Sequence, residues 1–526
     1  MAPVELTRRD VLAAFLGSTI ACRARNVETL PPGELIGAAH NIGHRLVEDR
    51  QSCLSPDCLS SIPWESHEVV IVGGGIAGLA AAWRLAHGGV RDVVLFELEP
   101  AIGGTSRSES AFPWGAHYIV APSEENRVLT RLLVEMGVIE NGAIGEEHLC
   151  RDPQERLFYR GRWYEGLYLH AGATNEDLRQ LRAFEAEIAK WSAWRDARGR
   201  RAFTIPIAYG SDDAEVTALD RMSMREWLDA RGLTSPRLRW LVGYACRDDY
   251  GSLLGDTSAW AGVFYFASRD ERPVITWPEG NGRLVSHLAR HVRPRTGWLV
   301  ARVMPTEAGA DVIALRDDEV IGIHARHVIF AAPQFIARRV IPSFREESRE
   351  FTYGSWMVAN LTLRDRPSSQ GFPLAWDNVL YESPSLGYVV STHQRGIDHG
   401  PTVLTYYYPL TTPNARETLL ATGRDEWADV ALTDLARAHP DIRKLTARID
   451  VMRWGHAMIR PRPNFLWSAA RTTSATPLGN IHFANTDLSG VALFEEALYH
   501  GVRAGEEVLG AGAGGGVGGG RVGGWL

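Results

Sequence analysis

The chain has 526 residues, and its 56 lysine and arginine residues against 63 aspartate and glutamate residues leave a formal net charge of −7. This mild acidity excludes the basic stripe typical of nucleic-acid-binding proteins, so we expect no nucleic-acid partner. Hydrophobic residues make up 45% of the chain and charged residues 23%, which is typical of a globular protein and excludes general disorder. A chain of this length is expected to fold around more than one core.

The N-terminus has the pattern of an export signal. Arg8 and Arg9 precede an apolar run from Val11 to Ala21 that is too short to span a bilayer but typical of a signal-peptide core. The arginine pair favours twin-arginine export. We therefore predict a signal peptide over residues 1–22 and a periplasmic or otherwise extracytoplasmic location; the alternative is an amphipathic N-terminus with a chance arginine pair. A membrane partner is expected only if Cys22 is lipidated.

Residues 23–66 combine prolines with mixed polar residues and are predicted to form a linker with room for one short helix. Within it, Cys53 and Cys58 are close enough to form a disulfide in an oxidising compartment, and whether they do stays open. Five cysteines are too few for a disulfide scaffold. Because no second pair of ligands accompanies these two, the sequence predicts no metal site.

The first strong motif is a βαβ unit that begins at residue 69. A buried strand, 69–72, is followed by a helical pattern over 76–86 and a second buried strand, 93–96. The turn between strand and helix satisfies G-x-G-x-x-G, and an acid ends the second strand about 20 residues later. This combination predicts a dinucleotide site formed by Gly73, Gly75, Ile76, Ala77, Gly78 and Glu97.

Each residue of this motif has a physical role. Gly73 permits the tight turn, Gly75 lets the backbone approach a pyrophosphate, and Gly78 lets the helix pack closely on the strand. The phosphates then lie at the positive N-terminus of the helix. Glu97 is placed to accept hydrogen bonds from a ribose hydroxyl.

A second glycine turn, Gly103-Gly104-Thr105-Ser106-Arg107, is followed by Trp114-Gly115-Ala116-His117. At this point the sequence resembles the flavin-containing amine oxidase superfamily, which includes protoporphyrinogen oxidases and carotenoid desaturases. In that superfamily the Gly-Gly turn passes the pyrophosphate toward the flavin, which implies cofactor contacts by Gly103, Gly104, Gly115 and Ala116. The resemblance continues through residues 277–282, and Val303 takes the place of a backbone contact to adenine.

The C-terminal segments 482–487 and 494–505 are similar to the closing flavin motif of the same superfamily. The resemblance implies that Asp487 binds the ribityl-phosphate region and that Ala497 lies on a helix whose N-terminus faces the flavin ring. A helix end aimed at the ring would stabilise the anionic reduced flavin. The implied cofactor is FAD.

Between these cofactor segments the sequence becomes rich in aromatic residues and in apolar residues at helical spacing. The chain is therefore predicted to pass repeatedly between two domains. The predicted fold class is α/β, with a Rossmann-like FAD-binding domain interleaved with a mixed α+β substrate domain. The FAD-binding segments are 67–150, 271–340 and 466–510; the substrate segments are 151–270 and 341–465; the glycine-rich tail, 511–526, is predicted to be disordered.

Several departures from the family pattern are informative. Thr105 stands where amine oxidases often have an arginine, which leaves Arg107 as the nearest candidate cation for the phosphates. The last cysteine is Cys246, so FAD should be non-covalent. Neither of the two lysines, Lys190 and Lys444, falls where the family places its flavin-side lysine. Leu493 replaces an aromatic residue of the amine cage. These losses argue against simple amine oxidation more than against redox chemistry.

The substrate side is less defined by the sequence. His117 is a candidate to contact the ring or to act as a base with a pKa suited to proton transfer, and a structural histidine is the alternative. His456, in the predicted substrate half, is a second catalytic candidate. The many aromatic residues of that half favour an apolar or partly aromatic small-molecule substrate in a cavity between domains.

The sequence therefore predicts an FAD-dependent oxidoreductase that transfers a hydride equivalent from an organic substrate, an amine or an apolar molecule, to the flavin. The electron acceptor, oxygen or a membrane carrier, stays open. A flavin-dependent desaturase or isomerase is the second enzymatic interpretation. A non-catalytic, exported binding protein with a dinucleotide fold is the third.

Overall fold

A computed structural model describes residues 30–37, 40–48, 61–109, 111–269, 272–342, 344, 350–512 and 525. The predicted signal peptide, Cys22, Cys53 and Cys58 and nearly all of the glycine-rich tail lie outside the described residues. Within the described part of the chain, no helix combines the length and the apolar character that crossing a membrane requires.

The dinucleotide domain is built on a seven-stranded sheet in the order β10-β3-β2-β13-β12-β11, with β19 paired to β13. Its strands are β2 (Trp64–Val72), β3 (Val93–Glu97), β10 (Pro294–Thr296), β11 (Leu299–Pro305), β12 (Ala310–Arg316), β13 (Glu319–Phe330) and β19 (Ile481–Phe483). The central strands β3, β2 and β13 are parallel. Because parallel strands are covered on both faces, Val69, Val70 and Ile71 are fully buried.

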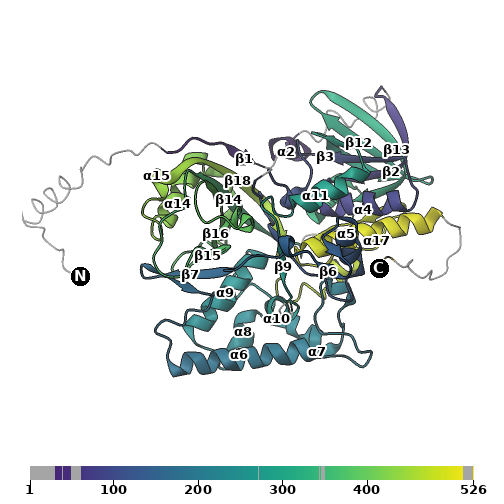
Figure 1. Cartoon of the computed structure of the whole chain (residues 1–526). Helices are drawn as coiled ribbons and strands as arrows, with labels where there is room; N and C mark the ends of the chain where they lie inside the picture. The colour runs from purple at the N-terminus through teal and green to yellow at the C-terminus, as the bar shows by residue number, and fades with distance from the viewer. Residues whose placement is uncertain are drawn as a thin grey trace, which may run out of the picture.

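Two long helices pack side by side on this sheet (Figure 1): α4 (Ile76–His87) and α17 (Phe494–Gly512). Their close crossing requires a glycine, because a Cβ atom on Gly501 would lie 2.2 Å from the carbonyl oxygen of Ala77. The helices α5 (Arg127–Glu135) and α11 (Gly282–Leu288) complete this layer. The first and last cofactor segments of the chain therefore form one unit.

The second sheet has eight strands in the order β1-β18-β14-β17-β16-β15-β7-β8. They are β1 (Leu35–Gly37), β7 (Glu155–Tyr159), β8 (Arg162–Glu165), β14 (Tyr353–Leu363), β15 (Asp377–Leu380), β16 (Gly387–Val390), β17 (Thr402–Leu410) and β18 (Thr446–Ile459). Figure 1 shows this sheet beside the dinucleotide sheet, with a helical layer below.

Part of the segment predicted to be a linker is structured. β1 pairs in parallel with β18, with Leu35 opposite Val451, and α2 (His40–Glu48) follows it. An edge strand exposes unpaired backbone groups, and the extension satisfies those of β18. The short helix α2 is within what the linker prediction allowed, whereas the paired strand β1 was not predicted.

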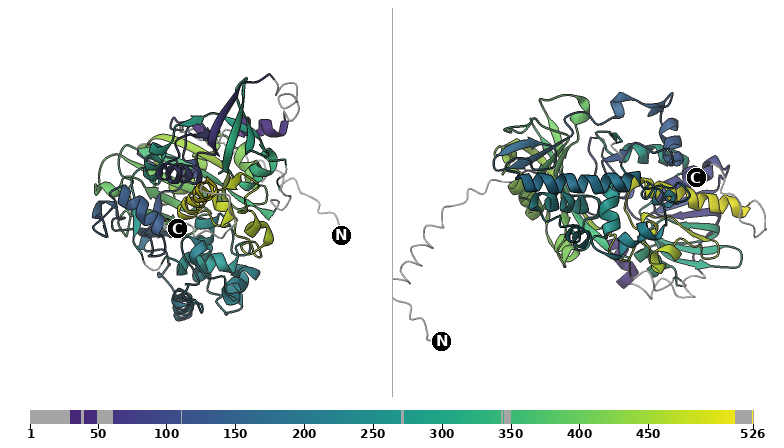
Figure 2. Two further views of the ribbon diagram at one scale, coloured as in Figure 1. Left: turned by 90° about the vertical axis from the view of Figure 1, so that its right-hand side faces the viewer. Right: turned by 90° about the horizontal axis from the view of Figure 1, so that it is seen from below.

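The helical layer consists of α6 (Asn175–Ala193), α7 (Ala214–Thr217), α8 (Met224–Asp229), α9 (Pro236–Tyr250) and α10 (Ala259–Ala267). Figure 2, in its right-hand view from below, shows α6 running across this layer. The stripe Leu181, Phe184 and Trp191 faces a buried aromatic core, as its helical spacing predicts. The predicted α/β class with interleaved domains is confirmed.

Shorter elements connect these layers. They are β4 (Tyr118–Val120), β5 (Ile139–Glu140), β6 (Ala143–Ile144), β9 (Val274–Thr276), α12 (Gln334–Val340), α13 (Ala415–Ala421), α14 (Arg424–Leu435), α15 (Ile442–Leu445) and α16 (Ala469–Thr473).

Candidate active site

Two adjoining cavities lie between the domains. The larger, of about 420 Å³, extends from the end of β3 past the glycine motif to the start of α17. The smaller, of about 280 Å³, lies between the second sheet and the helical layer. The wall that both cavities share is formed by Thr105, Ala116, Trp454, Ala457, Met458, Ala492, Leu493 and Phe494.

The glycine motif has the geometry that a dinucleotide requires. Gly73 has a φ of +106°, which favours glycine, and a Cβ atom on Gly78 would lie 1.9 Å from the carbonyl oxygen of Gly73. By contrast, a Cβ atom on Gly75 would meet no protein atom within 4 Å. The space in front of Gly75 is part of the larger cavity, which Ile76 and Ala77 also line at the helix N-terminus.

The second glycine turn packs directly against the first. The backbone N–H of Gly103 donates to the carbonyl oxygen of Gly74 at 2.8 Å, and Gly103 and Gly104 have φ angles of +112° and +56°. A Cβ atom on Gly115 would lie 2.2 Å from the carbonyl oxygen of Thr105. The two turns therefore form one continuous backbone surface, which lines the cavity with Ala116.

The carboxylate of Glu97 is held in place at the end of β3. Its oxygens accept the backbone N–H groups of Gly74 at 2.7 Å and of Glu99 at 2.8 Å. Burial raises the pKa of Glu97, while these two bonds act in the opposite direction. The carboxylate lines the larger cavity, so its remaining lone pairs are available to ribose hydroxyls.

Four predicted cofactor residues, Gly78, Arg107, Gly115 and Val303, do not line the larger cavity, and Gly115 lines only the smaller one. The side chain of Arg107 is buried, with its guanidinium 3.7 Å from the carboxylate of Glu99 and above the ring of Trp454. Val303 lies fully buried in β11, whereas Val300 lines the cavity. A register shift between Val300 and Arg302 changes which residues of β11 face each side.

At the flavin end, Asp487 and Ala497 line the larger cavity as the resemblance implies. Asp487 accepts the backbone N–H of Gln334 at 2.8 Å and the hydroxyl of Tyr353 at 2.6 Å. Burial raises the pKa of Asp487 to about 6. Sequence reasoning missed Tyr353, which comes from the other domain.

The N-terminal extension also contributes to this cavity. Gly43, His44 and Leu46 of α2 line it near Leu299 and Val300. No local pattern in a nine-residue helix signals such a contact, so sequence reasoning missed it. The glycine cradle, the acid at its ribose end and the long shared cavity all fit FAD.

The two histidines proposed as catalytic lie in different cavities. His117 lines the smaller cavity, where its Nδ1 lies 3.0 Å from the hydroxyl of Tyr407, and burial lowers its pKa to about 3. Such an imidazole is neutral near pH 7, which corrects the expectation of a pKa suited to proton transfer.

His456 lines only the larger cavity. It stacks on Phe335 at a centroid distance of 4.1 Å and accepts from Arg416, and burial lowers its pKa to about 4. The structure therefore places His456 on the cofactor side and not in the substrate cavity.

The smaller cavity combines aromatic walls with carboxylates. Its aromatic side chains are Tyr118, Tyr244, Tyr265, Trp356, Trp376, Tyr407, Trp454 and Phe494, together with the imidazole of His117. Its carboxylates are Glu155, Asp248, Asp249, Asp377 and Glu495. Asp249 forms an ion pair with Arg269 at 2.7 Å, and Glu495 lies in the field of Arg269 and Arg272.

The other three carboxylates, Glu155, Asp248 and Asp377, have no ion-pair partner among the described residues. Asp377 on β15 is the register partner of Glu155 on the parallel strand β7. Like charges in such positions repel each other. Burial raises the pKa of Asp248 to about 7, and burial with repulsion from Glu155 and Asp248 raises that of Asp377 well above its ordinary range.

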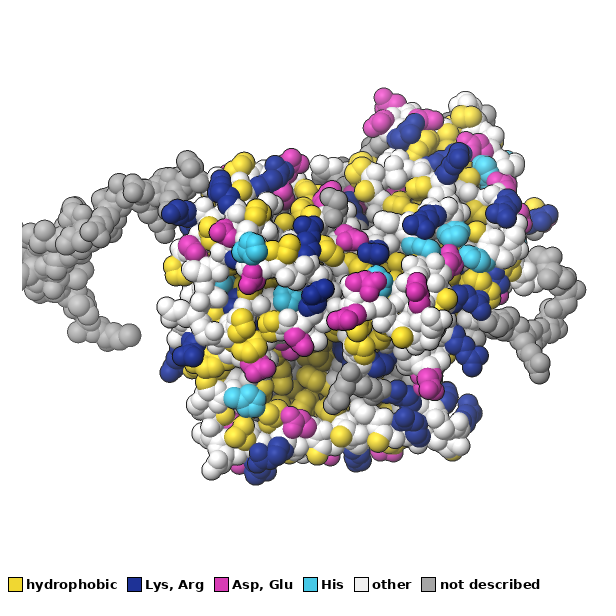
Figure 3. Space-filling view, viewed as in Figure 1, with side chains coloured by type: hydrophobic (Ala, Val, Ile, Leu, Met, Phe, Trp, Pro, Cys, Tyr) yellow, Lys and Arg dark blue, Asp and Glu magenta, His cyan; other side chains and the backbone are white. Residues whose placement is uncertain are grey.

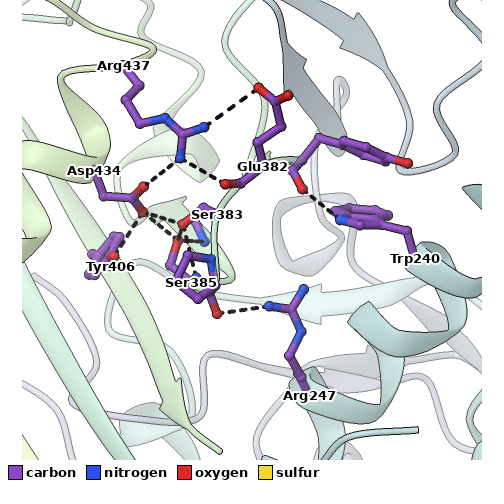
Figure 4. Close-up of polar contacts among 11 residues, drawn as sticks. Trp240, Arg247, Glu382, Ser383, Ser385, Tyr406, Asp434 and Arg437 are labelled. Carbon is purple, nitrogen blue, oxygen red and sulfur yellow. Dashed lines mark hydrogen bonds and ion pairs between the residues drawn. The ribbon is translucent and has the colours of Figure 1, made fainter. Parts of the chain in front are cut away.

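Helix α9 brings Asp248 to this group, and a hydrogen-bonded loop fixes α9 in place. Trp240 of α9 donates to the carbonyl oxygen of Tyr381 at 2.7 Å, and Arg247 donates to that of Pro384 at 2.9 Å. Figure 4 shows how the same loop is held from its other side by α14. There Asp434 accepts the hydroxyls of Ser383, Ser385 and Tyr406 at 2.7 to 3.0 Å.

A model of the family described as flavin containing amine oxidoreductase matches residues 76–509. The chain belongs to the flavin-containing amine oxidoreductase family. It is an FAD-binding enzyme, as the glycine and C-terminal motifs predict.

Individual curated relatives match this oxidoreductase over a much shorter stretch than the family model does. A peroxisomal N(1)-acetyl-spermine/spermidine oxidase of Bos taurus is 38% identical over 91 residues, which are 16% of this chain and 18% of that protein. The matched segment thus spans under a fifth of that relative's length.

Solved structures match over far more of the chain. A putrescine oxidase variant has a TM-score of 0.64 at 16% identity and covers 85% of this chain and 100% of its own. A fatty acid isomerase from P. acnes has a TM-score of 0.60 at 14% identity, with coverage of 83% and 97%. At these identities the likeness shows the shared fold and leaves the reaction open.

Proposed function

We propose that this oxidoreductase oxidises a small molecule that carries a cationic amine, with FAD as the immediate acceptor of a hydride equivalent. The observation that supports the proposal is the register pair Glu155 and Asp377, joined by Asp248, in one aromatic cavity. Three neighbouring carboxyl groups, which form no ion pair among the described residues and of which Asp248 alone lies in the field of a cation, Arg269, favour either protonation or a bound cation. A cationic substrate would relieve their repulsion.

The position of these acids indicates how the substrate lies. All three line the smaller cavity and none lines the wall that both cavities share, so a cation that they bind lies off the shared wall. A cation bound there directs the rest of the substrate toward Phe494 and Trp454. The aromatic side chains exclude water, which strengthens charge pairing in the cavity, and they provide faces for cation–π contacts.

The chain supplies placement and electrostatics, and bound FAD supplies the redox chemistry. The N-terminus of α17 begins at Phe494 on the shared wall, so its dipole stabilises negative charge that develops there. His117 remains a neutral wall residue beside Tyr407, and the hydroxyl of Tyr407 donates to the carbonyl oxygen of Gly115 at 2.8 Å.

A desaturase or isomerase is the second candidate. It is favoured by one observation: among the described residues, no lysine lines either cavity. The exposed side chains of Lys190 and Lys444 lie on α6 and α15, outside both.

A comparison of matched molecules distinguishes the two candidates. The rate at which the enzyme reduces a dye acceptor is measured with primary and secondary amines. The same rate is then measured with uncharged molecules of the same shape. Turnover of the amine and not of its isostere supports the proposal. Turnover of uncharged alkenes, with none of any amine, would support the second candidate.

The cellular location is a separate proposal. The paired arginines and the apolar run that follows them support export by the twin-arginine route, which moves folded proteins and so allows FAD to be inserted first.

A further inference from the structure

Three histidines and one glutamate from separate helices converge on the dinucleotide domain, away from both cavities. Glu135 is the last residue of α5 and His87 the last of α4. His287 lies in α11, and His291 ends the short 3₁₀ helix over Ala289–His291. In Figure 3 histidine side chains gather on the face that carries α4 and α11.

The geometry of the group is that of a metal site. The Nε2 atoms of His287, His291 and His87 lie 2.9, 3.5 and 3.5 Å from oxygens of the Glu135 carboxylate. Ligand atoms of a tetrahedral ion with bonds of about 2.0–2.1 Å are separated by roughly 3.3 Å. The ligand atoms of Glu135, His287 and His291 all lie within 4.8 Å of one another.

Neighbouring groups orient these side chains as second-shell partners do in known metal sites. The Nδ1 of His87 lies 2.9 Å from the carbonyl oxygen of Trp83, a bond that places the proton on Nδ1 and leaves the Nε2 lone pair facing Glu135. The indole N–H of Trp83 donates at 3.0 Å to Oε2 of Glu135, the oxygen that His87 faces, while His287 and His291 face Oε1. The tautomer and the carboxylate orientation are thus both set for coordination.

We propose that Glu135, His287 and His291 bind a divalent transition-metal ion of the Zn²⁺ type, and that His87, whose Nε2 lies outside this group but 3.5 Å from the Glu135 carboxylate, moves in as the fourth ligand. Imidazole nitrogens with one carboxylate oxygen suit such ions better than Ca²⁺ or Mg²⁺, which prefer oxygen ligands. The ion joins α4 and α5 of the first cofactor segment to α11 of the second. The site lies at the opposite end of α4 from the glycine motif, so its role is structural.

Exposure allows the ion to enter from solution. The side chain of His287 is 7% exposed, whereas those of His291, Glu135 and His87 are 22%, 30% and 36% exposed. One ligand is buried and three are more accessible, so the site is fixed to the core through His287 and is open to solvent on the side of the other ligands.

The test uses the full FAD-loaded chain, treated with a chelator and then titrated with Zn²⁺ against a chromophoric indicator. We expect one ion per chain and a higher Tm in the presence of Zn²⁺. Because each variant removes a direct ligand, His291→Ala and Glu135→Gln should each weaken Zn²⁺ binding by about 100-fold or more. His324→Ala is the matched control, since His324 pairs with Asp311 at 2.8 Å outside the group.

FAD absorbance of each variant shows that its fold is intact. If His291→Ala fails to retain FAD, His87→Gln serves in its place, because His87 is the most exposed of the ligands. Wild-type protein that binds no Zn²⁺ at micromolar concentration, or variants that bind it as tightly as the wild type, would overturn the proposal and leave an ordinary histidine–glutamate ion-pair cluster.

Discussion

Tyr353 of β14 donates its hydroxyl to the carboxylate of Asp487 at 2.6 Å, so a residue of the second sheet holds the acid of the flavin end in place. The backbone N–H of Gln334 provides the other bond to the same oxygen. The two domains are therefore joined at the cofactor site itself.

Replacing Tyr353 by phenylalanine is expected to weaken FAD binding by about tenfold, because a hydrogen bond to an ionised group contributes about 1.5–3 kcal/mol. The lost bond also raises the pKa of Asp487 further above about 6, so the deficit should grow as the pH falls. Fluorescence titration of the apoprotein with FAD at several pH values measures both effects. An affinity equal to that of the wild type at every pH would contradict this role.

Gly75→Val should abolish FAD retention without preventing folding. The new side chain enters space where no protein atom lies within 4 Å, so it occupies the path of the pyrophosphate and not the core. Gly510→Val, at an exposed position of α17 that is equally open, is the matched control. Circular dichroism should be native for both variants, and only the control should be yellow. A fully loaded Gly75→Val protein would disprove the placement.

The raised pKa of Asp248 predicts that the stability of the folded enzyme depends on pH. Its pKa in the folded enzyme, about 7, is above the ordinary value of 3.8, so the folded state binds a proton that the unfolded state has lost. The stability of the substrate-free enzyme should therefore fall as the pH rises from about 4 through 7. Asp248→Asn should make this decline in thermal stability measurably shallower, although Asp377 and Asp487, whose pKa values are also raised, continue to contribute to it, while the exposed control Asp398→Asn should leave it unchanged.

The same ionisation should affect the substrate. Because a cationic amine binds the ionised carboxyl group, KM is expected to rise as the pH falls below about 7, with a smaller change in kcat. Asp248→Asn should flatten this KM profile. A wild-type profile without any change between pH 6 and 8 would argue against Asp248 as part of the cation site.

Export is tested by replacing Arg8 and Arg9 with lysines. If the leader directs twin-arginine transport, the double variant should accumulate in the cytoplasm with its FAD bound, since that route tolerates little change at this pair. Cell fractionation of both forms gives the answer. Equal periplasmic recovery would refute the assigned route.

The parts of the molecule that the sequence predicted well are those encoded locally. The strand, glycine turn and helix at 69–87 are contiguous, so their pattern alone predicted the cradle and Glu97. The backbone contact assigned to Val303 stays a prediction from the resemblance; Val303 does not line the larger cavity, whereas Val300 of the same strand does, and a bulge between Val300 and Arg302 was not visible in the sequence.

The substrate cavity could not be predicted in this way. Glu155, Asp248 and Asp377 come from three distant segments, and only strand register and the packing of α9 bring them together. The pKa of His117 likewise depends on tertiary burial. The aromatic half of the chain correctly indicated apolar walls, but it gave no signal of the acids among them.

The most direct test of the central claim is anaerobic mixing of the FAD-loaded enzyme with amines of graded length, followed by flavin absorbance. The account predicts that a cationic amine bleaches the flavin, that its neutral isostere does not, and that Asp377→Asn raises the amine concentration needed for half-maximal bleaching. Bleaching by uncharged substrates alone, with full FAD occupancy and no response to any amine, would contradict it.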